Sequence, residues 1–173
     1  MKYLLWSLLN LALLGYFLYM VYGLFSKGRK IFQHRLKPVS IIIMMLGLAQ
    51  VLDRGDDFEP NNKKVFVENY EGNGGIKLAG LAMDDGLSLN FFLSAKFAYE
   101  DDELIVLETN SDLSGLTFGY TWNASKIVRL MESDVRGQPR YRVIGYLTWQ
   151  LFGFDIYSEE KDFSGTIPRN QIF

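Results

Sequence analysis

The chain has 173 residues, with no cysteine and a single histidine, His34. The absence of cysteine excludes disulfides, thiolate catalysis and sulfur-ligated metals, and one histidine cannot build a histidine-based triad or zinc site. Six of the 18 basic residues and none of the 20 acidic residues precede Asp53. The first part therefore carries a net charge of +6, and the remainder, with 12 basic residues, carries -8. An acidic domain repels phosphate backbones, which argues against binding of long nucleic acid.

The first predicted element is a membrane-spanning helix over residues 3–26. All 24 residues are uncharged, and most are Leu, Tyr, Phe or Val. At ~1.5 Å per residue, a helix of this length measures about 36 Å and can cross a bilayer with some tilt. A cleaved signal peptide is the alternative, but the apolar run is long and no small-residue cleavage pattern follows it. Asn10 is polar within this run, which favours packing against a partner helix.

A second apolar helix is predicted over residues 38–52, with Pro38 in its first turn. Its 15 residues make only ~22 Å, which is short for a span and leaves a buried or re-entrant helix as the alternative. We expect a second span, so that residues 1–52 form a helical hairpin that anchors the chain in the inner membrane of the cell.

The loop between the two helices, residues 27–37, holds five of the six basic residues of the N-terminal part. The positive-inside rule predicts that such a loop lies in the cytoplasm. With two spans, the rest of the chain would then lie outside the cytoplasm, and with one span it would lie inside. The sequence leaves both topologies open.

Beyond a short linker at residues 53–62, the periodicity indicates β-strands in one domain over residues 63–173. Residues 87–99 alternate between apolar and mostly polar side chains, which is typical of a half-buried strand. Turn residues such as Asp84, Asp85 and Gly86 separate the segments. About eight strands are predicted, at residues 64–70, 76–83, 87–99, 103–109, 116–122, 140–147, 149–157 and 163–167.

These strands are consecutive and joined by short turns, which favours an antiparallel meander. A meander of this size with one apolar face closes most economically into a small up-and-down β-barrel, because closure removes exposed edges. An open sheet covered by a helix is the alternative. Residues 123–132 fit either a short helix capped by Asn123 or another strand, and we expect the helix.

No catalytic signature is present in the sequence. The paired acids, such as Asp101 and Asp102, fall at predicted turns, where carboxylates usually face water rather than a buried acid–base site. The glycine-rich segment 72–75 leads into a predicted strand and not into a helix N-terminus, so a hairpin turn explains it better than a phosphate loop. We therefore expect a protein that is not an enzyme and has no cofactor or metal.

One basic and aromatic cluster is a candidate ligand site. Aromatic rings that stack on bases, beside guanidinium groups that pair with phosphates, recur in nucleotide pockets. Residues that are two positions apart on a strand, such as Tyr120 and Trp122 or Arg140 and Arg142, project from the same face of the sheet. The alternative is that the rings fill the core and the arginines solubilise its rim. The candidate ligand-binding residues are Tyr120, Trp122, Lys126, Arg129, Arg140 and Arg142.

The order of parts is two apolar N-terminal helices, a brief linker and about 120 residues of meandering strands. It resembles the two-transmembrane β-barrel effectors of bacterial cyclic-oligonucleotide (CBASS-type) anti-phage signalling. The resemblance implies a barrel that binds a cyclic di- or trinucleotide, oligomerises with copies of itself and disrupts the inner membrane. It also implies a cytoplasmic barrel, whereas the basic loop 27–37 favours the opposite side for a two-span protein.

The alternative function is that of a non-enzymatic accessory or assembly subunit of a membrane complex, with its β-domain outside the cytoplasm. This hypothesis accounts for the charge asymmetry and needs no ligand. The side on which the domain lies separates it from the effector hypothesis.

Overall fold

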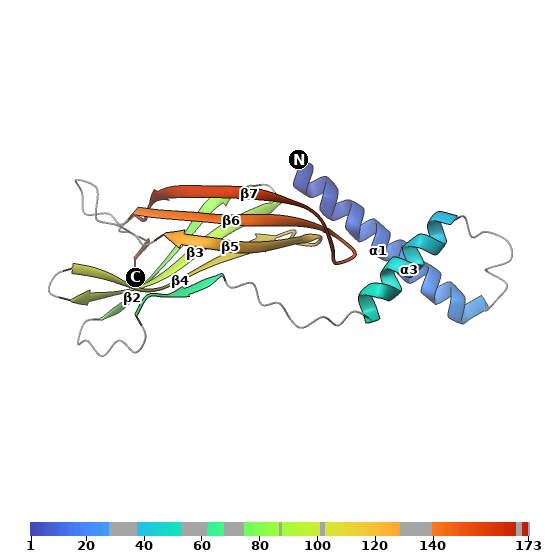
Figure 1. Cartoon of the computed structure of the whole chain (residues 1–173), viewed down its shortest axis with the longest axis horizontal. Coiled ribbons are helices and arrows are strands. Elements are labelled where there is room, and N and C mark those ends of the chain that lie inside the picture. Colours follow the sequence, from blue (N-terminus) through green and yellow to red (C-terminus); the bar gives the residue numbers. More distant parts are fainter. Residues whose placement is uncertain are drawn as a thin grey trace.

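The structure is a computed structural model of the whole chain, and it describes residues 1–27, 38–52, 62–67, 75–86, 88–100, 103–128, 140–168 and 171–172. Two helices, α1 (Lys2–Lys27) and α3 (Pro38–Leu52), precede the strands (Figure 1). Their bounds agree with the two predicted helices. Most of the predicted basic loop and of the predicted linker lies outside the described residues.

The described strands form two antiparallel sheets rather than one ring. The first has the order β1-β4-β3-β2 and the second the order β5-β6-β7. The antiparallel meander is confirmed, because β2-β3-β4 and β5-β6-β7 each pair in chain order. The predicted closed up-and-down barrel is not confirmed, since no hydrogen-bonded pairing among the described strands joins the two sheets. The strands are β1 (Lys63–Val65), β2 (Ile76–Asp85), β3 (Leu89–Glu100), β4 (Glu103–Gly115), β5 (Tyr120–Val128), β6 (Arg140–Leu151) and β7 (Phe154–Thr166).

The apolar core lies between the two sheets. Alternate residues of β3, from Leu89 to Phe97, are almost fully buried, as the period-two pattern predicts. They meet the aromatic residues of the second sheet. The ring of Phe91 lies 5.0 Å from that of Trp122 and 4.9 Å from that of Phe163, measured between centroids. Side chains rather than a hydrogen-bonded seam therefore hold the sheets together, supplemented by a hydrogen bond from Trp122 to Ser111 of β4.

Of the strand predicted over residues 116–122, only residues 120–122 belong to a strand, and the helix predicted over 123–132 is wrong for residues 123–128; residues 129–132 lie outside the described part of the chain. Residues 116–119 form the turn between β4 and β5, where Gly115 and Gly119 have positive φ angles of 94° and 85°. β5 then continues through the expected helix start as far as Val128. Pairing with β6 overrides the weak local preference for helix, with a bulge between Asn123 and Lys126.

The second corrected boundary lies between β6 and β7. The sequence suggested a turn near Thr148, but β6 runs to Leu151, and Phe152 and Gly153 form the turn, with φ angles of 51° and 78°. Positive φ at both central residues is the geometry of a two-residue hairpin turn, which normally selects Asn-Gly or Asp-Gly. Because phenylalanine is not a typical turn residue, the sequence at Phe152 does not indicate a turn. β7 also absorbs the strand expected separately at residues 163–167.

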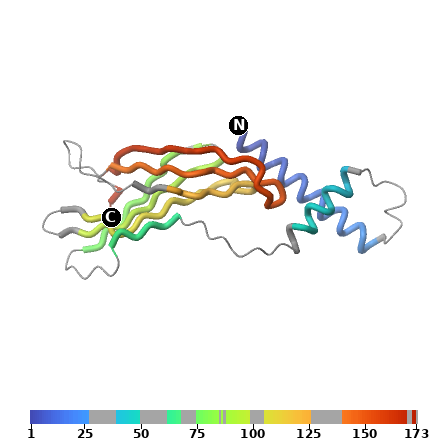
Figure 2. The backbone as a smooth tube through the Cα atoms, viewed as in Figure 1, coloured from blue at the N-terminus to red at the C-terminus, as the bar shows by residue number. Residues whose placement is uncertain are grey.

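Helix α1 begins beside the sheets, and its other end lies far from them (Figure 2). Tyr3 and Trp6 pack against the core cluster of the β-domain. α3 crosses α1 (Figure 1). The Phe17 ring of α1 lies directly against Gly47 of α3. The first turns of α1 are therefore part of the β-domain, while its later turns pair with α3.

Candidate functional site

Tyr120 and Trp122, expected to stack on a ligand, are buried in the core at 7% and 3% exposure. The indole Nε1 of Trp122 donates a hydrogen bond of 2.9 Å to Ser111 Oγ. The hydroxyl of Tyr120 donates one of 3.0 Å to the carbonyl oxygen of Tyr3 in α1. Both aromatic residues therefore have structural partners in the interior.

Arg140 and Arg142 lie on the exposed face of β6. Arg142 Nη2 is 2.6 Å from Asp162 Oδ2 of the neighbouring strand, and Arg142 Nε also donates to this carboxylate. The hydrogen bond and charge of Asp162 raise the pKa of Arg142, and the pKa of Asp162 is lowered by the same pair. A phosphate that bound Arg142 would have to compete with Asp162.

The structure does not bring the aromatic and the arginine members of the predicted site together. The two aromatic residues share one face of their sheet and the two arginines share one face, as the two-residue spacing predicts. The aromatic residues, however, lie on the face toward the core and the arginines on the outer face. Trp122 is paired with Leu147, which points into the core, and Arg142 precedes Leu147 by five residues, so it points outward. Lys126 lies in β5 opposite Ile144, and Arg129 lies outside the described residues.

A second cluster, which we call the junction, joins the start of α1 to the β-domain. Its aromatic part contains Tyr3 and Trp6 of α1 with Tyr120 and Trp149 of the sheet. The Tyr3 ring lies 5.9 Å from that of Tyr120 and 5.6 Å from that of Trp149, and Trp6 lies 5.5 Å from Trp149. Ring contacts at these distances and inclined angles are the favoured geometry for aromatic pairs. The helix is thus held by packing as well as by hydrogen bonds.

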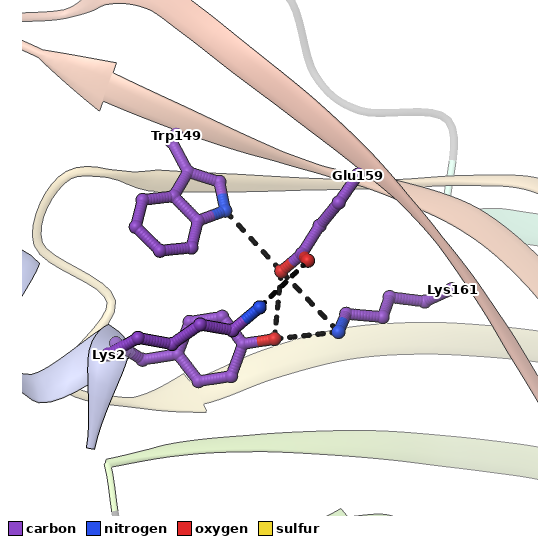
Figure 3. A network of polar contacts seen from close by, with 5 residues as sticks. Lys2, Trp149, Glu159 and Lys161 are labelled. Carbon is purple, nitrogen blue, oxygen red and sulfur yellow. Dashed lines mark hydrogen bonds and ion pairs between the residues drawn. The ribbon is translucent and has the colours of Figure 1, made fainter.

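Glu159 of β7 is the centre of the polar part of the junction (Figure 3). Its carboxylate accepts a hydrogen bond of 2.8 Å from the Tyr3 hydroxyl and is 3.1 Å from Lys2 Nζ. Lys161 Nζ lies 3.4 Å from the same carboxylate and donates a 2.6 Å hydrogen bond to the Tyr3 hydroxyl. The weaker contact from Trp149 Nε1 measures 3.4 Å. One carboxylate therefore connects the helix to two strands.

The charge state of Glu159 follows from these contacts. Burial alone would raise the pKa of its carboxyl, but the hydrogen bonds from Tyr3 and Lys2 and the charge of Lys161 outweigh burial and lower it. Burial is also the main reason why the pKa of the Tyr120 hydroxyl is raised far above its usual value. Glu159 is therefore an anion at neutral pH, and Tyr120 remains a hydrogen-bond donor to the helix.

The polar side chains of α1 face the hairpin turns of the β-domain. Trp6 Nε1 donates to the carbonyl oxygens of Gly119 and Gln150, at 3.2 and 3.1 Å. Ser7 Oγ donates to the Leu116 carbonyl at 2.9 Å. A Cβ atom added to Gly119 would lie 2.6 Å from the Asn10 amide nitrogen, so glycine is needed there for contact as well as for its φ angle.

Sequence reasoning missed the junction. Asn10 was expected to pack on a partner helix, but it packs on the β4–β5 turn and donates to the Trp6 carbonyl of its own helix. A usable signal was present, since Trp6, Ser7 and Asn10 recur at helical spacing within an otherwise apolar run. Mean hydropathy averages over the whole run and therefore does not detect that these polar groups share one face of the helix.

Comparison with models of known protein families, with curated proteins and with solved structures finds no match to this chain. Within the described residues, one helix, over Lys2–Ser26, is long and apolar enough to cross a membrane, and no group of three or more potential metal-ligating side chains is found. The apolar helix Val39–Ala49 is shorter.

Proposed function

We propose that the chain is a membrane-anchored protein that acts by binding rather than by catalysis. The distribution of side chains on α1 supports anchoring. Ser7 and Asn10 are buried, while Leu5 and Leu8 are exposed at 66% and 49%. A helix that hides polar groups and exposes leucines is suited to lipid, because water would favour the reverse arrangement.

The arrangement of the two helices also indicates on which side of the membrane the β-domain lies. The start of α1 and the end of α3 face the β-domain, whereas the end of α1 and the start of α3, next to the basic loop 27–37, point away from it (Figure 1). If the loop lies in the cytoplasm, as the positive-inside rule favours, the β-domain lies on the other side of the membrane. This arrangement requires α3 to return across the bilayer with α1.

The function that these observations favour is that of an accessory or assembly subunit of a membrane complex, with an extracytoplasmic β-domain. The observation that carries it is that the last turn of α1 and the first turn of α3, which flank the basic loop in sequence, lie on the side away from the β-domain (Figure 1). A subunit of this kind needs a rigid link to its anchor, which the junction around Glu159 and Tyr3 supplies.

Accessibility of single cysteines tests this proposal, because the natural chain has none. Ser94→Cys lies on an exposed position of β3, and Gln33→Cys lies in the basic loop. A membrane-impermeant maleimide added to spheroplasts should label Ser94→Cys at once and Gln33→Cys only after permeabilisation. The reverse pattern would contradict the subunit proposal and favour a cytoplasmic domain.

The second candidate is the cyclic-nucleotide effector, and one observation favours it. Because α1 packs on the core of the β-domain, a ligand that shifted β6 or β7 would also shift the membrane helix, for example through Glu159. Such coupling is what a ligand-triggered oligomerisation and membrane disruption would require. In this candidate the anion-binding side chains are Arg140 and Arg142.

Calorimetric titration of the full chain in nanodiscs with cyclic di- and trinucleotides tests the effector. We expect binding that is weakened in Arg142→Ala but not in Lys96→Ala, a matched control that removes an exposed, ion-paired cation from the other sheet. Absence of heat with every ligand would rule out this candidate. Binding that both variants retain would leave the function and reject Arg142 as its site.

A further inference from the structure

Four large apolar side chains are exposed at two strand connections beside α1, which we call the tips: the β4–β5 turn, which joins the two sheets, and the β6–β7 hairpin. Leu116 and Phe118 belong to the β4–β5 turn, and Phe154 and Ile156 directly follow the β6–β7 turn. Their exposure ranges from 38% for Phe154 to 57% for Ile156. Hairpin turns in water are dominated by Gly, Asn, Asp, Pro and Ser, so such tips are adapted to an apolar environment.

We propose that these two tips lie in the interfacial layer of the bilayer that α1 enters, so that the β-domain itself binds lipid. The inference rests on the proposed membrane anchoring. Crossing the hydrocarbon core takes ~20 helical residues. Counted back from Ser26, such a segment begins at Ser7, whose hydroxyl bonds to Leu116 at the β4–β5 tip.

The β6–β7 tip contacts α1 still further along. Phe152 packs its ring 6.4 Å from the ring of Phe17, which belongs to the candidate span Lys2–Ser26. Phe152 makes this contact from a turn position with a φ angle of 51°. A tip that contacts the candidate span lies at the bilayer rather than in bulk water, so continuity with α1 identifies the bilayer as the occupant.

Backbone polar groups are the usual obstacle to placing turns at a membrane, since each unsatisfied group costs several kcal/mol in lipid. At the β4–β5 tip and at Gln150, near the end of β6, the helix supplies hydrogen-bond donors. Trp6 donates to the carbonyls of Gly119 and Gln150, and Ser7 donates to that of Leu116. The amide of Gln150 in turn donates to the Gly119 carbonyl at 2.8 Å. The polar groups of α1 thus make the tips compatible with a nonaqueous layer.

Asp155 limits the depth of insertion. It lies between the two apolar residues of the β6–β7 tip, is exposed, and accepts a 2.8 Å hydrogen bond from the Gln150 side chain. A carboxylate is costly in the hydrocarbon but is tolerated among headgroups. The tips therefore reach the interfacial layer, where apolar side chains such as Phe118 are buried at the boundary between headgroups and acyl chains, and do not cross the membrane.

Depth-dependent quenching on the full chain in liposomes tests the inference. Single cysteines replace Phe118 and Ile156 at the tips, Ser94 on the distal exposed face of β3, and Tyr22 in α1, and each carries an environment-sensitive fluorophore. Brominated acyl chains report contact with lipid, and aqueous iodide reports contact with water. We expect the labels at 118 and 156 to be quenched by brominated lipid, as at 22, and to emit at shorter wavelength than the label at 94.

The controls separate the possible failures. If the labels at 118 and 156 respond to iodide as the label at 94 does, while the label at 22 responds to lipid, the anchor stands and the inference fails. If the label at 22 is also open to iodide, the anchoring itself fails. If 118 and 156 are shielded from both quenchers, a second copy of the chain covers the tips, which overturns lipid as the occupant.

Discussion

Strand β3 and the first half of α1 both contribute to the core of the β-domain, but they sort their side chains in opposite ways. In β3, Phe91 and Leu93 are buried at 1% and 2% exposure, and the polar Ser94 and Lys96 face outward. In α1, Ser7 and Asn10 point inward, and leucines point outward. The strand follows the rule for a protein in water, and the helix follows the rule for a protein in lipid.

Different interactions hold β3 and the start of α1 in place. β3 is fixed by burial of apolar area and by two antiparallel neighbours. The start of α1 is fixed by directional contacts, namely the hydrogen bonds of Trp6, Ser7 and Tyr3 to the β-domain. Core substitutions in β3 should therefore cost more free energy of unfolding than substitutions at the junction, and substitutions outside both should cost least.

The largest effect is expected for Phe91→Ala. The ring is fully buried between Trp122 and Phe163, so its removal should lower the free energy of unfolding by about 3–5 kcal/mol. Phe92→Ala is the matched control, since the neighbouring ring is on the opposite face and 39% exposed. Urea unfolding of the full chain in mild detergent, followed by tryptophan fluorescence, measures both. Equal losses would show that the core does not lie where we describe it.

A smaller loss is expected for Trp6→Ala at the junction. The substitution removes two hydrogen bonds and the contact with Trp149, and leaves two carbonyl oxygens without that donor. We expect a loss of about 2 kcal/mol, because the site is only partly buried. Leu5→Ala, one residue earlier on the outward face, should leave unfolding in detergent unchanged. An unchanged Trp6→Ala would mean that the helix contributes nothing to the β-domain.

The contrast also explains which features the sequence could predict. The period-two pattern around Phe91 reports directly on which side of a strand meets the core, so β3 and both helices were predicted closely. The β6–β7 turn was misplaced because Phe152 adopts a glycine-like φ angle in the turn and packs on Phe17, which is distant in sequence, so no local residue pattern marks the turn. Whether two faces such as those of Trp122 and Arg142 point the same way depends on strand register, which no local pattern encodes.

A pH-dependent effect is expected at Glu159. Its folded-state pKa is lowered, so its contribution to stability is complete above the ordinary carboxyl pKa of 4.5 and is lost as the pH falls through the folded value. The wild type should therefore lose stability below about pH 4.5 more steeply than Glu159→Gln, which has no charge to lose. Unfolding midpoints measured from pH 7 to pH 3 test this, and parallel profiles would contradict it.

The smallest effect is expected for Glu108→Gln, the counterpart of Glu159→Gln on the outer side of the first sheet. Glu108 also lies between two lysines, with Lys63 Nζ at 3.1 Å and Lys96 Nζ at 3.2 Å, and its pKa is likewise lowered. Both carboxylates lie between two lysines, but Glu159 also accepts a hydrogen bond from Tyr3, and the side chain of its partner Lys161 is only 24% exposed. Both lysines of Glu108 are about half exposed to solvent.

Exposed ion pairs are worth about 0–1 kcal/mol and weaken further when salt shortens the screening length. We therefore expect Glu108→Gln to lower stability slightly at low ionic strength and not at all in high salt. The loss in Glu159→Gln should persist in high salt, because Tyr3 and Lys161 bind that carboxylate in a partly buried site. Unfolding of both variants at two salt concentrations measures the difference. If salt abolished both losses equally, the contacts of Glu159 would be ordinary surface ion pairs, and the helix would be held by its aromatic contacts and by the hydrogen bonds of Trp6 and Ser7.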